Sequence, residues 1–483
     1  MISAYVQELK PYSLQELSRK LGCEENKAAI PLLRKLKEYG VLKTVRRDEA
    51  PKDLSDLQEE DEVLSDVGED ENIRYVFAFV GILVIAGRVL NCYPKYLKNT
   101  TEPKEELRQV LRVLQKYRAS KDELIIFSEN AAGSSANRLA VILFLMQDYM
   151  ENGLYTNPEE VHEINGDGEI QWERTIERSI AWISHDRPYY TELFTRRSVP
   201  DEDNYFTRLH KWILTQASRE LTDADLLELF DLPEVELTDE DGEAFGEKDV
   251  ILYQLEKELN SQFVTGKQQI LKAMRAYLRE EKSLYDKGCF ALYGTNHYNL
   301  VWEEVCSVIS DNQLRKPLNK LNLPVPLQPK YKGSELLIEV IEKPLWTVTG
   351  RTAKETLIPD IVTIEKNEDG YRFIISDAKY YTPVLNRNEF PQRQPGIESV
   401  TKQYLYQLAF QKFAREHGFI KPMLNCFLLP TEKDEVEDCG EVELKMLNEL
   451  GLENIKIRFI PAKRAYQYYL TGKMMKTDEL LLN

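Results

Sequence analysis

Residues 358–379 read IPDIVTIEKNEDGYRFIISDAK, in which two short apolar runs are separated by a polar segment. The segment Asn367–Gly370 has the polar, glycine-ended composition of a turn, so the pattern predicts a β-hairpin. Asp360 stands just before the first apolar run, and Asp377 stands just after the second. If the turn is centred on the middle of the polar segment, a regular hairpin sets these two aspartates opposite one another at the same end of the sheet.

Such a hairpin brings together the groups that metal-assisted phosphodiester hydrolysis requires. Lys379 lies two residues after Asp377 and therefore on the same face, because side chains alternate along a strand. Hard Mg²⁺ prefers oxygen ligands, and Asp360, Asp377 and the carbonyl of Ala378 supply them while leaving positions for phosphate and water. Lys379 can orient the attacking water and offset charge on phosphorus. The alternative is a surface hairpin that carries an ordinary salt bridge.

Two predicted helices flank this hairpin. The first, Asn299–Ile309, is amphipathic, and Glu303 or Glu304 can reach a metal from its edge. The second, Ser399–Arg415, carries Gln403, which can touch a substrate phosphate or an active carboxylate. The alternative for both helices is that the polar side chains are simply solvated.

The 483-residue chain has a formal net charge of −18, but its acidity is local. Residues 51–71 hold ten acids and one lysine, and residues 220–249 hold thirteen acids and one lysine. Without these two runs the chain carries a net charge of +3, so a DNA-facing surface elsewhere is not excluded. The first run predicts a flexible linker, because such segments repel themselves and bury little. The second run is acidic but also contains apolar residues at 226–230, which can form a short helix.

The N-terminal residues predict a small winged-helix-like module. Ser13–Glu16 has the composition of a capping box, a second helix runs from about residue 24 to residue 39, and a strand with a basic end follows. The basic side chains available for DNA phosphates are Lys27, Arg34, Lys35, Arg46 and Arg47. A protein-binding module or a helical cap is nearly as well supported, because Pro31 inside the second helix is unusual for a recognition helix.

Several other classes of protein are disfavoured. The six cysteines form no C-x-x-C pair and the five histidines no H-E-x-x-H motif, which argues against zinc sites. The longest apolar run, residues 75–90, is about 16 residues and contains Arg88, so it is too short to span a bilayer. The N-terminus lacks a signal-peptide pattern, so we expect a cytoplasmic protein that does not enter a membrane. No stretch matches G-x-x-x-x-G-K-[ST], so any nucleotide hydrolysis through a P-loop requires another chain.

The hairpin motif resembles that of the PD-(D/E)XK nuclease superfamily. Pro359-Asp360, sixteen further residues and Asp377-Ala378-Lys379 are preceded by the glutamate helix and followed by the glutamine helix. Residues 168–176, 189–192 and 209–212 read GEIQWERTI, YYTE and LHKW, and they are similar to segments of the LlaJI-type restriction endonucleases, relatives of McrC, the nuclease subunit of McrBC. This resemblance covers most of the chain from about Tyr75 onward.

The residues and the resemblance together predict a multidomain α/β protein. We expect a winged-helix-like module at 1–50, an acidic linker at 51–72, a mixed α+β domain coupling to a motor partner at 73–259 and a PD-(D/E)XK nuclease domain at 260–483. A central mixed sheet flanked by helices is expected in the last. The implied activity is that of a Mg²⁺-dependent endonuclease subunit of a GTP-dependent restriction–modification system in phage defence. It would cut double-stranded DNA when coupled to a separate McrB-like AAA+ GTPase, which hydrolyses the GTP.

The resemblance also implies roles for single residues. Asp360, Asp377 and Lys379 would form the catalytic core, with Glu303 as the helix acid and Gln403 as a further catalytic residue. Asp360, Asp377, Ala378 and Glu303 would hold the metal. One departure affects Gln403, because related nucleases often carry Gln-x-x-x-Tyr on this helix and here the fourth residue on is Gln407. The alternative reading of the whole chain is a non-catalytic winged-helix DNA-binding regulator or assembly protein.

Overall fold

The chain forms two compact units, seen in a computed structural model that describes residues 1–46, 67–68, 72–120, 137–201, 203–280, 282–368 and 370–480. Unit 1 is built mainly from residues 125–291, and unit 2 from most of residues 2–124 together with residues 292–483. The boundaries of the expected domains stay a prediction. The expected acidic linker at 51–72 lies outside the described residues apart from 67, 68 and 72. The multidomain, mixed α/β character of the chain is confirmed.

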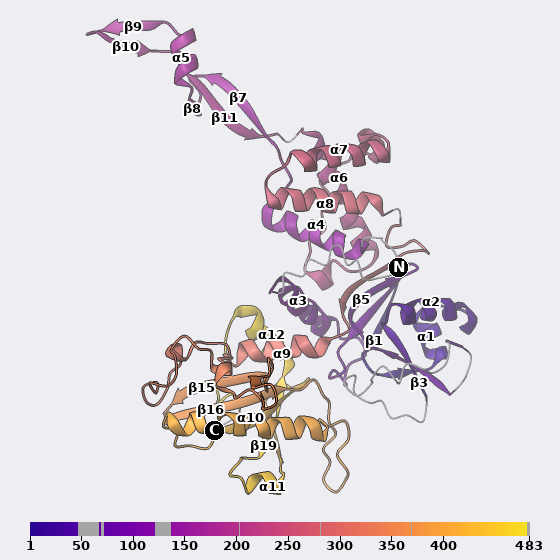
Figure 1. The fold of residues 1–483 in the computed structure, drawn as a ribbon. Coiled ribbons are helices and arrows are strands. Elements are labelled where there is room, and N and C mark those ends of the chain that lie inside the picture. The colour runs from indigo at the N-terminus through magenta and orange to yellow at the C-terminus, as the bar shows by residue number, and fades with distance from the viewer. Residues whose placement is uncertain are drawn as a thin grey trace. The chain divides into compact units, whose positions relative to one another are not determined.

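Four helices form the body of unit 1 (Figure 1), namely α4 (Arg138–Asn152), α6 (Tyr205–Asp223), α7 (Lys248–Ser261) and α8 (Thr265–Arg279). Helix α8 contacts α4 and α7, and α4 also contacts α6. The second acidic run is folded against α6, where it forms two short 3₁₀ turns, η2 (Glu228–Phe230) and η3 (Gly242–Phe245). Its apolar residues Leu226, Phe230 and Phe245 are buried, which explains why this run is ordered despite its charge.

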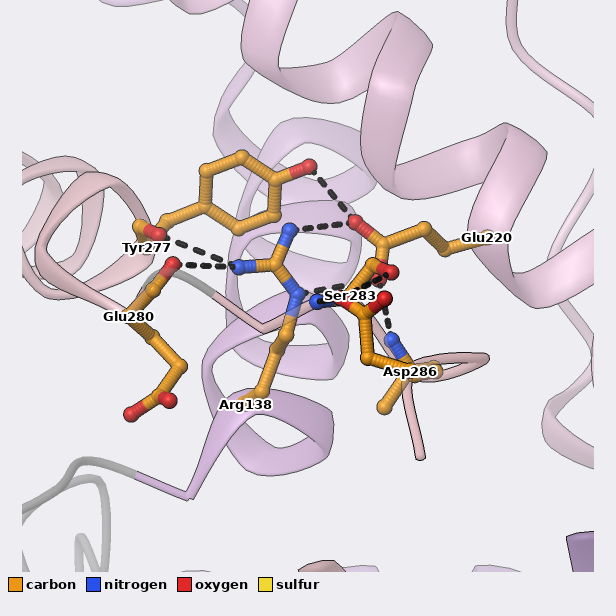
Figure 2. Close-up of polar contacts among 7 residues, drawn as sticks. Arg138, Glu220, Tyr277, Glu280, Ser283 and Asp286 are labelled. Atoms are coloured by element: carbon orange, nitrogen blue, oxygen red, sulfur yellow. Dashed lines mark hydrogen bonds and ion pairs between the residues drawn. The ribbon is translucent and has the colours of Figure 1, made fainter. Parts of the chain in front are cut away.

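A buried ion pair ties α4 to α6 and α8 (Figure 2). Nε of Arg138 donates to Oε2 of Glu220 at 2.9 Å, and Nη2 of Arg138 contacts the other carboxylate oxygen. The hydroxyl of Tyr277 and the amide of Leu284 also donate to Glu220, at 2.9 and 3.0 Å, while Nη1 of Arg138 donates to the carbonyl of Glu280 at 3.1 Å. Both charges are therefore paired and hydrogen-bonded, as burial requires.

An antiparallel arm, residues 158–200, also belongs to unit 1 (Figure 1). Strand β11 (Phe194–Pro200) lies between β7 (Pro158–Ile164) and β8 (Glu169–Ile170). The chain continues from β8 into helix α5 (Trp172–Arg178) and the hairpin of β9 (Ala181–Ser184) and β10 (Arg187–Tyr190). Apolar side chains at this end of the arm are more than half exposed, and they include Trp172, Ile176, Ile180, Trp182, Ile183 and Tyr189.

The N-terminal part of unit 2 contains the two predicted helices, α1 (Leu14–Lys20) and α2 (Asn26–Glu38). The predicted capping box is present, because Ser13 and Glu16 bond reciprocally at the start of α1. A three-stranded sheet accompanies the helices, in the order β2 (Pro11–Tyr12), β4 (Ile73–Phe77) and β3 (Leu42–Arg46). Among the basic candidates for DNA contact, Arg34 donates to the carbonyl of Val67 at 3.3 Å, and Arg47 lies outside the described residues. A winged-helix function for these elements stays a prediction.

A second sheet of four strands has the order β1 (Ile2–Gln7), β6 (Arg88–Tyr93), β5 (Val80–Ile85) and β12 (Phe290–Thr295), and helix α3 (Lys104–Ser120) follows β6 along the chain. The sequence did not predict β1, which pairs in parallel with β6. Gly81 is required in β5, because a Cβ there would lie 2.1 Å from the carbonyl oxygen of Tyr293 and its φ is +139°.

The C-terminal part of unit 2 is a mixed five-stranded sheet in the order β15 (Ile361–Asn367), β16 (Gly370–Ala378), β17 (Leu424–Thr431), β19 (Ile455–Pro461) and β18 (Glu437–Val442). Strands β16, β17 and β19 run parallel, and the two outer strands run antiparallel to their neighbours. Helices α9 (Tyr298–Ile309) and α12 (Ala462–Thr471) lie above the sheet in Figure 1, and α10 (Ile397–Glu416) lies beneath it. The minor elements are β13 (Leu345–Trp346), β14 (Arg351–Thr352), η4 (Leu318–Lys320), η5 (Leu337–Val340) and α11 (Lys445–Asn448).

Within the described part of the chain, no helix combines the length and the apolar composition that a membrane crossing needs.

Candidate active site

The predicted hairpin is confirmed, and its register places the two aspartates opposite one another. Strands β15 and β16 pair from Asn367↔Gly370 to Ile361↔Ser376, so Asp360 and Asp377 form the next step of the same ladder. This register arises because the turn is centred between residues 368 and 369, with equal numbers of residues on both sides. The hairpin therefore brings two carboxylates to one edge of the sheet.

Both carboxylates lie on the face of the hairpin that α10 covers. Val362 and Ile375 are fully buried in a cluster with Phe410 of α10, and alternation along the strands puts Asp360 and Asp377 on this same face. Nζ of Lys379 lies 2.9 Å from Oδ2 of Asp377, so the lysine also points to this face, as the sequence predicted.

Burial and proximity control the charge state of these groups. Burial raises the pKa of Asp360 to about 9, and the hydrogen bond with Asp377 and the negative charge of that residue add to the effect. Burial lowers the pKa of Lys379, but the charge of Asp377 and the hydrogen bond to it outweigh burial, and the pKa ends above its usual value. Two acids and one charged amine thus share a single buried site.

The backbone around Asp360 is held by the residues that follow α9. Nδ2 of Asn312 donates to the carbonyl of Asp360 at 2.7 Å, and the amide of Val362 donates to Oδ1 of Asn312 at 3.1 Å. Gln313 continues this pattern, since its amide donates to the carbonyl of Val362 at 2.7 Å. The free edge of β15 is therefore covered, and the first aspartate is fixed at the level of the main chain.

Glu303 is half-buried on α9, and its negative charge contributes to the raised pKa of Asp360. The structure thus places the predicted helix acid within electrostatic range of the aspartate pair. Among the described residues, however, no group of three or more His, Cys, Asp or Glu side chains is close enough to hold a metal ion. The metal-binding role of Asp360, Asp377, Ala378 and Glu303 therefore stays a prediction.

Gln403 occupies a different place from the carboxylates. Its side chain is fully buried between α10 and the sheet, and Nε2 donates to Oδ1 of Asn425 at 2.6 Å and to the carbonyl of Ile375 at 3.2 Å. Gln407, one turn on, is also buried, and its Oε1 accepts from the amide of Glu453 at 3.0 Å. These contacts anchor α10 on the sheet, so the structure does not bring Gln403 to the site through a direct contact with either aspartate.

Tyr406 is a residue of the site that the sequence reasoning missed. Burial raises the pKa of its phenol to about 12, and the negative charges of Asp377 and Asp360 raise it further. The phenol therefore lies near both carboxylates. Nothing in the local sequence singled out this tyrosine among the residues of the predicted helix Ser399–Arg415.

The sequence also did not predict the buried contacts that support the chain directly after Lys379. Tyr380, directly after the lysine, donates its hydroxyl to Oε2 of Glu8 at 2.5 Å, and the same oxygen accepts from the amide of Lys95 at 3.1 Å. Nζ of Lys95 lies 4.5 Å from the centre of the Tyr380 ring. Residues from the N-terminal part of the chain thus support the end of β16.

The chain is similar to known restriction proteins. The chain is 25% identical over 424 residues to the Type II restriction enzyme BsuMI component YdjA of Bacillus subtilis (strain 168), covering 85% of this chain and 84% of that protein. Two solved structures show low overall similarity at 14% identity. One is a half-complex of Thermococcus gammatolerans McrB AAA+ hexamers with bound McrC, with a TM-score of 0.37 over 97% of this chain and 99% of that one. The other is the McrBC complex of the same organism, with a TM-score of 0.24 over 62% and 84%.

The LlaJI restriction endonuclease model matches residues 79–463. The matched residues include the aspartate pair, the lysine and helices α9 and α10. The chain therefore belongs to the LlaJI restriction endonuclease family and is a nuclease component of a restriction system.

Proposed function

We propose that the chain is a Mg²⁺-dependent DNA endonuclease subunit that hydrolyses phosphodiester bonds of double-stranded DNA when a separate AAA+ GTPase acts with it. The observation that supports this most is the register of the β15–β16 hairpin, which sets Asp360 opposite Asp377 and joins Lys379 to Asp377 at 2.9 Å. A non-catalytic regulator has no need to bury two acids and a lysine at one sheet edge, so the enzyme is favoured over that alternative.

The donor set fits a hard divalent cation. Oδ1 of Asp377 is buried and has no hydrogen-bond partner among the described residues, and the neighbouring Asp360 is half-buried. Two carboxylate oxygens and the carbonyl of Ala378 are ligands that Mg²⁺ accepts, with water in the remaining positions. When bound, the metal would polarise the scissile phosphate and lower the pKa of a coordinated water. The negative charge of Glu303 acts on Asp360, which supports Glu303 as a further acid of the proposed site.

Lys379 acts as a positive charge rather than as a base. Because its pKa lies above the usual value, the amine stays protonated at neutral pH. A protonated lysine beside Asp377 can donate to a phosphate oxygen and to the attacking water, and it offsets the negative charge that develops on phosphorus. Proton removal from the water then falls to a carboxylate or to solvent.

The exposed end of the arm supports a protein partner for unit 1. Ile180, Trp182 and Ile183 are 80%, 65% and 70% exposed, and such a cluster of large apolar side chains is characteristic of an interaction surface. The chain has no P-loop sequence, so the proposed GTPase is another protein. We propose that the arm docks on this motor, within the coupling domain expected at residues 73–259. Trp182→Ser with Ile183→Ser should then leave the partner's GTP hydrolysis unstimulated without changing the fold of unit 2.

Asp377→Ala tests the nuclease assignment. The variant should fold, because the residue lies at a strand end, and it should lose cleavage of duplex DNA in the presence of Mg²⁺, the motor and GTP. Asp478→Asn, on an exposed C-terminal segment of the same unit, is the matched control and should cut like the wild type. Unchanged cutting by Asp377→Ala would show that the hairpin is not the active site.

A further inference from the structure

The segment between Lys379 and α10, residues 383–396, forms a projecting loop beside the site. Val384 and Gln392 close its base through two backbone hydrogen bonds of 3.0 and 3.3 Å. The residues that lead into it from the lysine, Tyr380–Thr382, are buried. The loop therefore starts from a rigid stem next to the catalytic groups.

This 383–396 loop carries cations on its surface. Arg387 and Arg393 are both exposed, and neither forms an ion pair with any residue that the structure describes. The single acid of the loop, Glu389, accepts a hydrogen bond of 2.9 Å from Nδ2 of Asn386. Exposed guanidinium groups a few residues from a phosphodiester site are well suited to contact the sugar-phosphate backbone.

Lys98 comes from the chain after β6 and is exposed. The carboxylate of Glu432 accepts from the amides of Lys98 and Asn99 at 2.8 and 3.0 Å, so the backbone at this point is held against the end of β17. Partial burial lowers the pKa of Lys98, the positive charge of Arg393 lowers it further, and Glu432 opposes this. Lys98 is thereby placed at the carboxyl end of β17, the strand that pairs with β16, and it brings a cation from a distant part of the sequence to this side of the sheet.

The loop also presents an aromatic ring to solvent. Phe390 is 92% exposed, between Glu389 and Pro391, and nothing in the described part of the chain covers it. Burying such a ring in water-free surroundings is favourable, and nucleic-acid-binding proteins insert apolar side chains between base steps or stack them on bases.

We propose that the 383–396 loop is a DNA-contacting element next to the cleavage site, in which Arg393 and Lys98 hold a backbone phosphate and Phe390 contacts the bases. This inference rests on the proposed nuclease function, and it names the surface that grips the substrate. Duplex DNA is the occupant, because the surface combines unpaired cations with one exposed ring at the edge where the phosphodiester must lie. The loop thereby positions the duplex relative to the aspartate pair.

The test measures duplex binding by the full-length chain in an Asp377→Ala background, so that cleavage does not interfere. Arg393→Ala and Lys98→Ala should each weaken binding of a fluorescein-labelled duplex roughly five- to tenfold at low salt. Each should also make the slope of log affinity against log salt shallower by about one, because one phosphate contact is lost. Phe390→Ala should weaken binding by about tenfold with the slope unchanged, because stacking is not ionic.

Two matched controls lie at the opposite edge of the sheet, just before β17. Ile420 is 96% exposed and Lys421 follows it, so Ile420→Ala and Lys421→Ala remove an exposed apolar side chain and a cation away from the site. Both should bind like the parent. If the loop variants bind duplex DNA as tightly as the controls, this inference is wrong. If the wild type still cuts DNA in that case, the proposed nuclease function is unaffected. If the wild type neither binds nor cuts duplex DNA, both fail.

Discussion

The backbone amide of Ala378 donates a hydrogen bond of 3.2 Å to Oδ2 of Asp360. The residue that follows the second aspartate thus holds the carboxylate of the first, across the hairpin. The separation of the two acids is consequently set by the strand register and by one main-chain contact rather than by freely rotating side chains.

Replacing Lys379 by methionine should slow DNA cleavage strongly while weakening metal binding less. The variant keeps the length and the apolar stem of the side chain but loses the amine that lies 2.9 Å from Asp377. We expect cleavage to fall by about 10²–10³-fold, a typical cost of losing one electrostatic contact to the transition state. The affinity for Mg²⁺ should fall less than in Asp360→Ala or Asp377→Ala. A loss of metal binding equal to that of the aspartate variants would contradict this role.

Metal binding should depend steeply on pH. The pKa of Asp360 is raised to about 9, so at neutral pH the carboxyl pair retains a proton that a cation must displace. Affinity should therefore rise with pH, by about tenfold per unit below 9, and titration calorimetry in two buffers of different ionisation enthalpy should detect the released proton. Asp377→Asn removes the charge that helps raise the pKa and should reduce this linked release. A pH-independent affinity in the wild type would refute the prediction.

We expect the Gln403 side chain to contribute to the stability of the fold rather than to catalysis. Gln403→Leu leaves Oδ1 of Asn425 and the carbonyl of Ile375 without their donor in a fully buried position, at an expected cost of about 1–3 kcal/mol. Metal affinity should be unchanged. Gln411→Leu, on a part-exposed turn of the same helix, should be nearly neutral in the same melting experiment. A normal melting curve with lost metal affinity would instead restore the catalytic role that the sequence predicted.

In unit 1, removing one charge from the buried ion pair of Arg138 and Glu220 should strongly lower the stability of the fold (Figure 2). Arg138→Met leaves Glu220 buried without its cation, which should cost about 3–5 kcal/mol in chemical unfolding. The adjacent pair of Arg219 and Glu236 has nearly the same chemistry but is 55% and 65% exposed, so Arg219→Met should cost under about 1 kcal/mol. Equal costs for the two variants would show that burial does not set the strength of the pair.

His210 should make unit 1 sensitive to acid. Its ring is fully buried, Nδ1 accepts from the amide of Tyr155 at 3.0 Å, and burial lowers the pKa to about 4. The unfolded chain, with a histidine pKa near 6.5, binds the proton first, so stability is complete above pH 6.5 and is lost as the pH falls toward 4. Between pH 7.5 and 5 the loss should be about 2 kcal/mol. His210→Asn should flatten this pH dependence, whereas His185→Asn, at an exposed position, should not.

The sequence by itself determined the local geometry of the catalytic hairpin. The turn composition and the two apolar runs specify the register, because one face of each strand must be buried, and a shift by one residue would expose Val362 and Ile375. With that register, the spacing of Asp360, Asp377 and Lys379 along the chain puts them together at one end of the hairpin. The helices that carry Glu303 and Gln403 were predictable for the same reason, since helical periodicity is also local.

Only the tertiary structure decided which side chains of those helices reach the site. The rotation of α10 about its axis depends on how Phe410 and Phe413 pack on the sheet, and this rotation brings Tyr406 to the carboxylates while turning Gln403 into the core. Contacts between distant segments, such as Glu8 with Tyr380 and Lys98 with Glu432, have no local signature. They arise because buried polar groups and apolar faces must find partners wherever the fold supplies them, and the order of residues along the chain does not encode that choice in any one segment.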